Sequence, residues 1–224
     1  MKRFSCVIFD LDGTLTQTNE LIFASFNHVA QKYTHRTYTP QEIIGMFGPP
    51  EEVSVGNIVG KENIDDAMDD FCEFYSEHHP RMAKIHEGIK GVLEFLKQHE
   101  LLLALFTGKG KRTTLITLEK FGIKNFFDLI VTGNDVEKYK PSADGIHRVM
   151  KRFELQPDEV LMVGDAVSDL KAANEAGVAM AAVLWDSYAK EIVMGMDADF
   201  HFHSVQEFAG WLNNAVHFYG ERTP

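Results

Sequence analysis

Three short apolar runs in this chain each stop abruptly at polar residues. The runs cover residues 6–9, 101–106 and 160–163, and aliphatic side chains dominate them. Runs of this length and composition are typical of strands buried on both faces of a parallel sheet. In open sheets of this kind, ligands bind beyond the carboxyl ends of the strands. The sequence therefore predicts that polar residues far apart in the chain meet at one edge of a sheet.

The polar residues that follow the runs are of the kinds that bind phosphate and metal ions. They are Asp10 and Asp12 after the first run, Thr107 and Gly108 after the second, and Asp165 and Asp169 after the third. Lys140 stands just before a predicted helix and completes the set. Carboxylates beside a hydroxyl and a lysine suit the joint binding of a divalent cation and a phosphoryl group. The set predicts an enzyme.

Strand and helix signals alternate from residue 86 onward, which predicts an α/β fold. Besides the three runs, strands are expected at residues 128–131, 179–184 and 198–202. Such alternation gives a Rossmann-like parallel sheet with helices on both faces.

Residues 17–83 differ from the rest because they carry helix signals only. The predicted organisation is therefore a core of residues 1–16 and 84–224 and an inserted α-helical cap of residues 17–83. The insert leaves and re-enters the core close to the predicted site, which is where a lid belongs.

The chain is acidic, with a formal net charge of −11 at pH 7. Nucleic acids and anionic membranes attract clustered Lys and Arg, so neither is expected as a partner. No apolar run is long enough to span a bilayer and the N-terminus does not resemble a signal peptide, so a cytoplasmic location is expected. The expected partner is a small phosphorylated metabolite, and both a monomer and a homodimer are compatible with the sequence.

Cys6 and Cys72 lack metal-binding spacing and are expected to be buried thiols, and a disulfide between them is the less favoured alternative.

Asp10 and Asp12 stand two residues apart, and Gly13 after them allows a tight turn. One carboxylate can attack phosphorus in line and also bind a metal, while the other serves as general acid and base for the leaving group. A plain Asp-x-Asp-Gly turn is an equally good interpretation of these residues taken alone.

Gly164-Asp165-x-x-x-Asp169 lies at a predicted strand-to-helix junction. Mg²⁺ prefers oxygen ligands and keeps some of its waters, so two or three carboxylates suit it. Helix capping by Asp165 or Ser168 would explain this motif taken alone. The aspartates after the first run make a magnesium site the favoured interpretation.

Loop 107–110 can cradle a phosphate with a hydroxyl and backbone N–H donors at the start of a helix. It is not a Walker A loop, because Lys111 is followed by Arg112 rather than Ser or Thr. Lys140, before Pro141, can neutralise the attacking carboxylate and the phosphoryl oxygens. A Lys-Pro pair without this context is usually a surface loop.

The ordered set of motifs resembles the haloacid dehalogenase (HAD) superfamily. The similar segments are Phe9-Asp10-Leu11-Asp12-Gly13-Thr14-Leu15, Thr107-Gly108, Lys140-Pro141 and Gly164-Asp165-x-x-x-Asp169. The helical stretch after the first motif looks like the α-helical cap of that superfamily. Gly48-Pro49-Pro50-Glu51 and Glu87-Gly88-Ile89 look like its phosphoglycolate phosphatase-like branch.

The resemblance implies a role for each matching residue. Asp10 would be the nucleophile that forms an aspartyl-phosphate, and Asp12 the acid and base. Thr107, Gly108 and Lys140 would hold the phosphoryl group. Mg²⁺ would bind Asp10, the backbone carbonyl of Asp12, Asp165 and, directly or through a partner, Asp169.

Two departures from the family pattern concern loops. The second motif commonly has Asn or Ser where this chain has Gly108, which leaves a backbone contact to phosphate at that position. Ala143 replaces a second proline after Lys140-Pro141.

Asp12 favours phosphoryl transfer, because dehalogenases and phosphonatases of this superfamily lack the second aspartate.

The leading hypothesis is a Mg²⁺-dependent phosphatase for a small phosphomonoester such as phosphoglycolate or a sugar phosphate. The alternatives are a phosphotransferase of the β-phosphoglucomutase type, an inorganic pyrophosphatase and a non-catalytic protein that binds a phosphometabolite. Thr14 disfavours the mutase, which usually has a bulkier aliphatic residue there. Candidate substrate contacts are Asn19, Phe23, residues 47–52 and Arg81.

Overall fold

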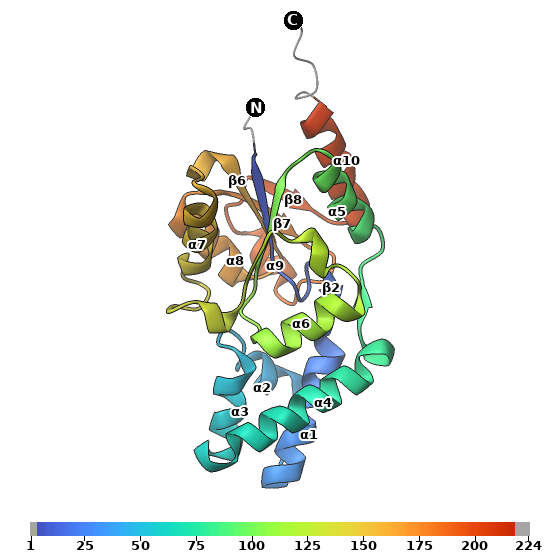
Figure 1. The fold of residues 1–224 in the computed structure, drawn as a ribbon, viewed down its shortest axis with the longest axis vertical. Helices are drawn as coiled ribbons and strands as arrows, with labels where there is room; N and C mark the ends of the chain where they lie inside the picture. The colour runs from blue at the N-terminus through green and yellow to red at the C-terminus, as the bar shows by residue number, and fades with distance from the viewer. Residues whose placement is uncertain (1–3, 218–224) are drawn as a thin grey trace, which may run out of the picture.

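A six-stranded parallel sheet forms the centre of the computed structural model, which describes residues 4–217 (Figure 1). The strand order is β5-β4-β1-β6-β7-β8, and each neighbouring pair is parallel. The strands are β1 (Cys6–Phe9), β4 (Leu102–Phe106), β5 (Leu129–Val131), β6 (Val160–Gly164), β7 (Ala179–Val183) and β8 (Phe200–Phe202). The predicted α/β fold is confirmed.

Alternate residues of β1 pack into two separate hydrophobic clusters because a strand sends successive side chains to opposite faces. Val7 and Phe9 belong to the cluster under α5 (Ile89–Gln98) and α10 (Val205–His217). Cys6 and Ile8 belong to the cluster on the other face. That face is covered by α7 (Asp144–Phe153), α8 (Val167–Ala176) and the short α9 (Lys190–Met194). Figure 1 shows α7 and α8 on one side of the sheet and α5 and α10 on the other.

The carboxyl ends of three strands lie side by side at the middle of the sheet. Phe9, the last residue of β1, pairs with Leu105 of β4 and with Val163 of β6. The polar residues that follow these strands therefore emerge at one edge, as the sequence predicts.

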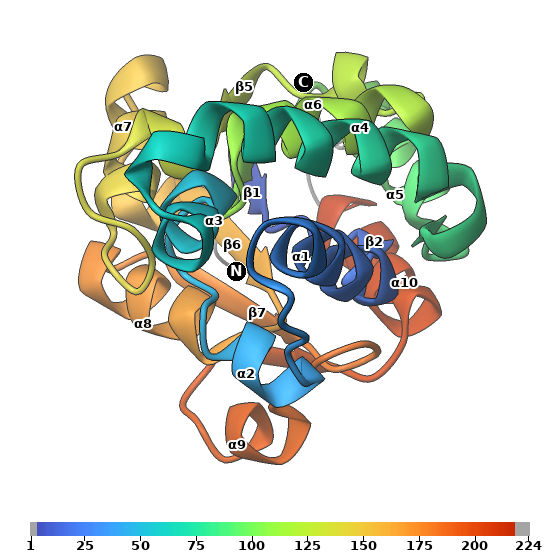
Figure 2. The same cartoon turned by 90° about the horizontal axis from the view of Figure 1, so that it is seen from below.

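The helical insert (residues 19–82) packs beyond that edge around a hydrophobic cluster of its own. It contains α1 (Asn19–Thr34), α2 (Pro40–Ile44), α3 (Glu51–Val59) and α4 (Ile64–Met82). Phe26 of α1 meets Phe71 of α4 edge to face, with ring centroids 5.1 Å apart. The view from below shows the insert's helices lying over the end of the sheet, next to α6 (Lys111–Lys120) (Figure 2). The division into core and cap at residues 16/17 and 83/84 stays a prediction.

Several local predictions were wrong. The two connections to the insert pair as an unpredicted antiparallel ribbon of β2 (Thr16–Gln17) and β3 (Lys84–Ile85), and Gln17 is the one residue of the ribbon that lies in the stretch expected to be all-helical, residues 17–83. The helix expected from residue 86 begins only at Ile89, after Gly88 with a φ of +91°. Helix α9 lies where no helix was expected.

Cys6 and Cys72 are both free and buried, which confirms the expectation of unpaired thiols. Within the described part of the chain, no helix has the length and apolar character needed to cross a membrane.

Candidate active site

Asp10 lies at the centre of the site, directly after β1. Its backbone N–H donates to the carbonyl of Val163 at 2.9 Å, which ties it to the end of β6. Its carboxylate accepts a hydrogen bond from the Lys140 ammonium at 2.7 Å. Burial raises the pKa of Asp10 to about 7, although Lys140 acts in the opposite direction. The side chain is therefore a buried carboxylate whose ionised form depends on nearby positive charge.

The turn after Asp10 brings Asp165 close. Gly13 has a φ of +88°, and a Cβ there would lie 2.5 Å from a carboxylate oxygen of Asp165, so only glycine fits. The Thr14 hydroxyl donates to Asp165 at 2.8 Å. From the sequence, Thr14 served only as an argument against a mutase. In the structure, its hydroxyl orients a carboxylate of the site.

Three buried carboxylates form a cluster that suits a divalent cation. Asp10, Asp165 and Asp169 each offer an oxygen within 4.8 Å of the others. Burial and the neighbouring carboxylates raise the pKa of Asp165 well above its usual range. Lys140 is the one ammonium that binds this cluster among the described residues, donating to Asp10 and to Asp169 at 2.6 Å. The excess of negative charge and the oxygen donors fit Mg²⁺.

Asp169 differs from the other two carboxylates because both its oxygens already accept hydrogen bonds. One takes the Lys140 ammonium and the other takes the Ala166 backbone N–H at 3.0 Å. Asp10 and Asp165 are thus better placed to bind a metal directly. The role of Asp169 as a ligand stays a prediction.

Asp12 turns its carboxylate away from this cluster. One oxygen accepts the Thr18 hydroxyl, and the other lies 3.3 Å from the Lys109 ammonium. The carboxylate lines the same pocket as Asp10. This position suits proton transfer to a leaving group, whereas the predicted metal contact would use the backbone carbonyl of Asp12.

Thr107 and Gly108 form the loop after β4. Thr107 is buried, and its hydroxyl accepts the Lys109 backbone N–H at 3.2 Å. A Cβ at Gly108 would lie 2.8 Å from the carbonyl oxygen of Gly48 in the helical insert. The glycine that departs from the family pattern is therefore required by the close approach of the insert.

Sequence reasoning missed Lys109 and the specific role of Glu51. The Lys109 side chain is 3% exposed, and its ammonium lies 3.3 Å from Asp12 and 3.4 Å from Glu51. Glu51 begins α3 in the insert, yet its carboxylate accepts the Gly110 N–H and the Thr113 hydroxyl of the core. Despite burial, Asp12, Tyr75 and Glu51 raise the pKa of Lys109. The only sequence signal was that Lys109 sits in the predicted phosphate loop.

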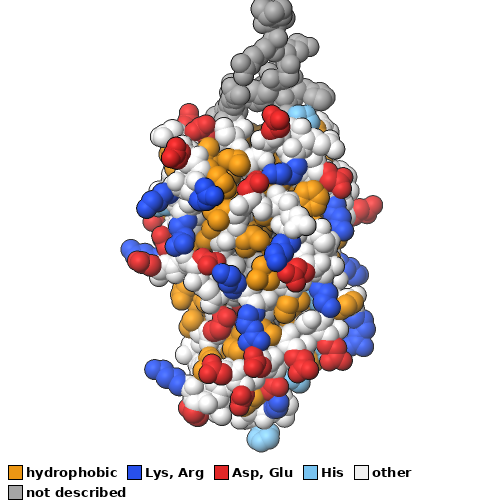
Figure 3. All heavy atoms as spheres, viewed as in Figure 1, with side chains coloured by type: hydrophobic (Ala, Val, Ile, Leu, Met, Phe, Trp, Pro, Cys, Tyr) orange, Lys and Arg blue, Asp and Glu red, His pale blue; other side chains and the backbone are white. Residues whose placement is uncertain are grey.

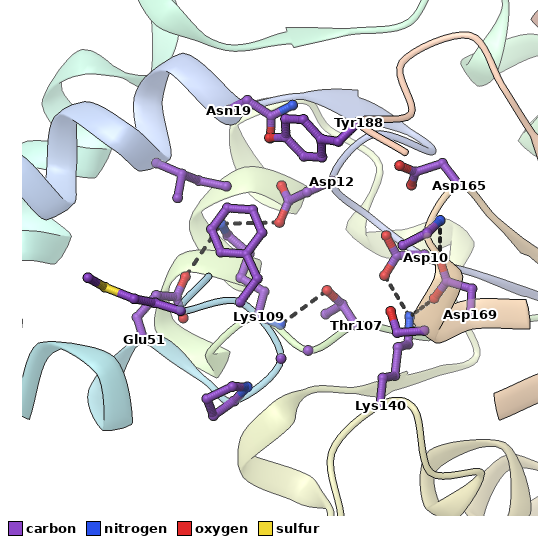
Figure 4. A pocket seen from close by; sticks show the side chains of 18 of the residues that line it. Asp10, Asp12, Asn19, Glu51, Thr107, Lys109, Lys140, Asp165, Asp169 and Tyr188 are labelled. Atoms are coloured by element: carbon purple, nitrogen blue, oxygen red, sulfur yellow. Dashed lines mark hydrogen bonds and ion pairs between the residues drawn. The ribbon is translucent and has the colours of Figure 1, made fainter. Parts of the chain in front are cut away.

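These groups surround a small pocket of about 160 Å³ between the sheet edge and the helical insert (Figure 4). Its apolar wall comes from the insert and includes Ile22, Phe26, Met46, Phe47 and Pro49.

The expected substrate contacts are only partly found in this pocket. Asn19, Phe47 and Glu51 line it, as expected. Phe23 is not among the lining residues and stacks on Phe47 instead, with ring centroids 6.4 Å apart. Arg81 lines a separate surface hollow.

Comparison with known proteins places the chain in a family. The model of the "Haloacid dehalogenase-like hydrolase" family matches residues 7–183. The chain belongs to this HAD-like hydrolase family. It is therefore an enzyme of the hydrolase class, as the sequence predicts.

The relatives of this HAD-like hydrolase match it over nearly their whole length. "Pyrophosphatase PpaX" of Halalkalibacterium halodurans is 31% identical over 205 residues, covering 92% of this chain and 95% of the relative. A PpaX of Bacillus cereus is 29% identical, with 95% and 98% covered. A predicted phosphoglycolate phosphatase of Haemophilus somnus has a similar fold, with a TM-score of 0.82, 22% identity, and 96% and 99% covered. CbbY of Rhodobacter sphaeroides, solved with phosphate, gives a TM-score of 0.79 at 21% identity, with 92% and 96% covered.

Proposed function

We propose that this HAD-like hydrolase is a Mg²⁺-dependent phosphatase that acts on a small phosphorylated metabolite. One observation carries the proposal: Asp10 lies buried beside Lys140 and two further carboxylates and lines the pocket between the sheet edge and the insert. A nucleophile, its counter-charge and metal-binding oxygens thus converge where a phosphoryl group can enter. Residues 17–83 are proposed to be the cap that closes over it.

The buried carboxylates support a metal site on the Asp10 side of the pocket. Asp10 and Asp165 would hold Mg²⁺, with Asp169 and the Asp12 carbonyl as further ligands. When bound, the ion supplies positive charge that offsets the carboxylates and the phosphoryl oxygens.

The chain's own residues divide the chemistry between them. An Asp10 oxygen forms a bond to phosphorus while the bond from phosphorus to the leaving oxygen breaks, and Asp12 gives that oxygen a proton. Water then attacks the aspartyl-phosphate, Asp12 takes the water's proton, and the Asp10 carboxylate leaves. Thr107 and Lys140 bind the phosphoryl oxygens, with the charge of Lys140 strengthened by the dry surroundings.

The size of the pocket favours a substrate of few atoms. Its volume of about 160 Å³ is below the roughly 300–1,000 Å³ of ordinary ligand sites. A phosphoglycolate-like monoester therefore suits it better than a sugar phosphate. Inorganic pyrophosphate is the second candidate, because relatives covered over nearly their full length are named pyrophosphatases.

The test is phosphate release from a panel of phosphometabolites with Mg²⁺ or chelator. Asp10→Asn should lower release by more than about 10⁴-fold, because it removes the nucleophile. Asp158→Asn is the matched control and should keep full activity, because Asp158 is exposed in the turn before β6, at the end of that strand opposite the pocket. Strong Mg²⁺-dependent turnover by Asp10→Asn would overturn the proposal. A hexose 1-phosphate converted to its isomer without free phosphate would instead indicate the mutase.

A further inference from the structure

Two buried lysines face the pocket from opposite sides, and they differ in how fully they are engaged (Figure 4). Lys140 donates short hydrogen bonds to Asp10 and Asp169. Lys109 points into the other half of the pocket, beside Asp12 and Glu51. Thr107 lies between the two halves.

The Lys109 ammonium is incompletely satisfied. Among the residues that the structure describes, it has no partner at hydrogen-bonding geometry. An ammonium has three donors, and its contacts with the Asp12 and Glu51 carboxylates, at 3.3 and 3.4 Å, and with the Tyr75 side chain do not align as hydrogen bonds. The Glu51 carboxylate is shared with other donors, because its two oxygens also accept hydrogen bonds from the Thr113 hydroxyl and the Gly110 N–H.

The surroundings of Lys109 favour a bound anion. The Tyr75 ring lies 4.7 Å from its ammonium on one side, and the apolar wall of the insert closes the pocket on another. Such surroundings strengthen the attraction between an ammonium and an anion.

We propose that Lys109 binds a second anionic group of the substrate. Preferred substrates then carry a phosphoryl or carboxylate group within a few atoms of the phosphoryl group that Asp10 accepts. The pocket volume of about 160 Å³ keeps the two groups close together. This inference rests on the proposed phosphatase function and names the substrate class for the same site.

The competing explanation is that Lys109 only holds Asp12 and Glu51 in place. The two explanations differ in which substrates suffer when the charge is removed. A lysine that binds the second anion matters only for substrates that carry one, whereas a lysine that positions Asp12 matters for every substrate.

The experiment compares Lys109→Met with Lys111→Met by steady-state kinetics. Lys111, the first residue of α6, lies two residues after Lys109, but its side chain is 60% exposed, so its variant should behave like the wild type. For pyrophosphate and phosphoglycolate, Lys109→Met should lower kcat/KM by at least about 30-fold, mainly through KM. For acetyl phosphate, which has one anionic group, the loss should stay below about 3-fold. An equal loss on all three substrates would overturn the proposal, and so would no loss.

A binding measurement tests the proposal without turnover. With Mg²⁺, calorimetry should show the wild type binding methylenebisphosphonate at least about 10-fold more tightly than methylphosphonate, because only the former reaches both lysines. Lys109→Met, or Lys109→Gln if the first variant does not fold, should remove that preference. A wild type without the preference would overturn the proposal.

The outcomes also separate the two proposals and the two kinds of anion. A wild type that releases phosphate from no substrate would remove the proposed function itself. Turnover without selective loss in the variant would remove only the role of Lys109. A preference for pyrophosphate over phosphoglycolate would identify the second group as a phosphoryl, and the reverse preference would identify it as a carboxylate.

Discussion

The two halves of the pocket are built differently. Around Lys140, every partner belongs to the sheet edge, and its ammonium donates at 2.7 Å to Asp10 and 2.6 Å to Asp169. Around Lys109, the contacts are longer, and Glu51 comes from the helical insert. One half is complete within the core, whereas the other is complete only when the insert lies against it.

If the proposed roles hold, the Lys140 half carries out the reaction and the Lys109 half recognises the rest of the substrate. Groups that react need fixed positions, which the carboxyl ends of adjacent strands provide. Groups that recognise the rest of a substrate can lie on a boundary that opens and closes. On the face seen in Figure 3, Lys and Arg side chains are mixed with Asp and Glu side chains and do not form a single basic patch.

The largest effect is expected from breaking the Lys140 half. Lys140→Met leaves Asp10 and Asp169 without their shared ammonium and removes the charge that is proposed to stabilise the transition state. Activity should fall by at least about 100-fold on pyrophosphate and acetyl phosphate alike. Initial rates on both substrates measure it, and a loss confined to one of them would contradict the division into halves.

The second prediction concerns the carboxylates of the Lys140 half, whose effect on thermal stability should depend on both Mg²⁺ and pH. The raised pKa values of Asp10, about 7, and Asp165 mean that the folded protein holds protons that the unfolded chain releases near pH 4. Without metal, stability therefore falls as the pH rises from about 4 to about 7, and protons compete with Mg²⁺ for Asp10 below about pH 7. Saturating Mg²⁺ should raise the Tm by roughly 5 °C at pH 8 and by much less at pH 5.

Thermal melting with Mg²⁺ or chelator at both pH values measures this shift. Asp165→Asn is the control, because it removes a donor and one of the raised pKa values. Its Tm should respond little to Mg²⁺ at either pH. Equal shifts at pH 5 and pH 8 in the wild type would contradict the assignment of the metal to these carboxylates.

A smaller effect is expected from loosening the Lys109 half. Glu51→Ala leaves the buried Gly110 N–H without its acceptor, and the buried Thr113 hydroxyl keeps only the Gly110 carbonyl at 3.2 Å. The free energy of unfolding should fall by about 1–3 kcal/mol, as for other buried hydrogen bonds to a charged group. Urea denaturation measures it, and an unchanged midpoint would show that Glu51 does not hold the insert to the core.

The smallest effect is expected from an exposed contact between the same two parts. Asp69 of α4 pairs with Arg112 of α6 at 2.8 Å, but the two side chains are 74% and 48% exposed. Asp69→Ala should cost less than about 0.5 kcal/mol, because water screens such pairs. The same denaturation curves measure it. If Asp69→Ala lowered the free energy of unfolding as much as Glu51→Ala, burial would not explain the strength of the two contacts.

Much of the core could be predicted because its signals are local. The apolar runs that become β1, β4 and β6 are each continuous in sequence, and their burial follows from composition. The ribbon of β2 and β3 could not be predicted in this way. Each of its strands has two residues, too few for any periodic pattern, and the pairing joins Thr16 to Ile85 across the whole insert.

The sequence by itself determined the parallel sheet and the edge at which Asp10, Thr107 and Asp165 gather, since strand ends in a parallel sheet point the same way. Only the tertiary structure decided which neighbours those residues have. Glu51 reaches Gly110 across 59 residues, and Gly108 must be a glycine because Gly48 packs against it. Such contacts depend on how the insert packs on the core. Packing between segments far apart in the chain produces no local sequence pattern from which it could be predicted.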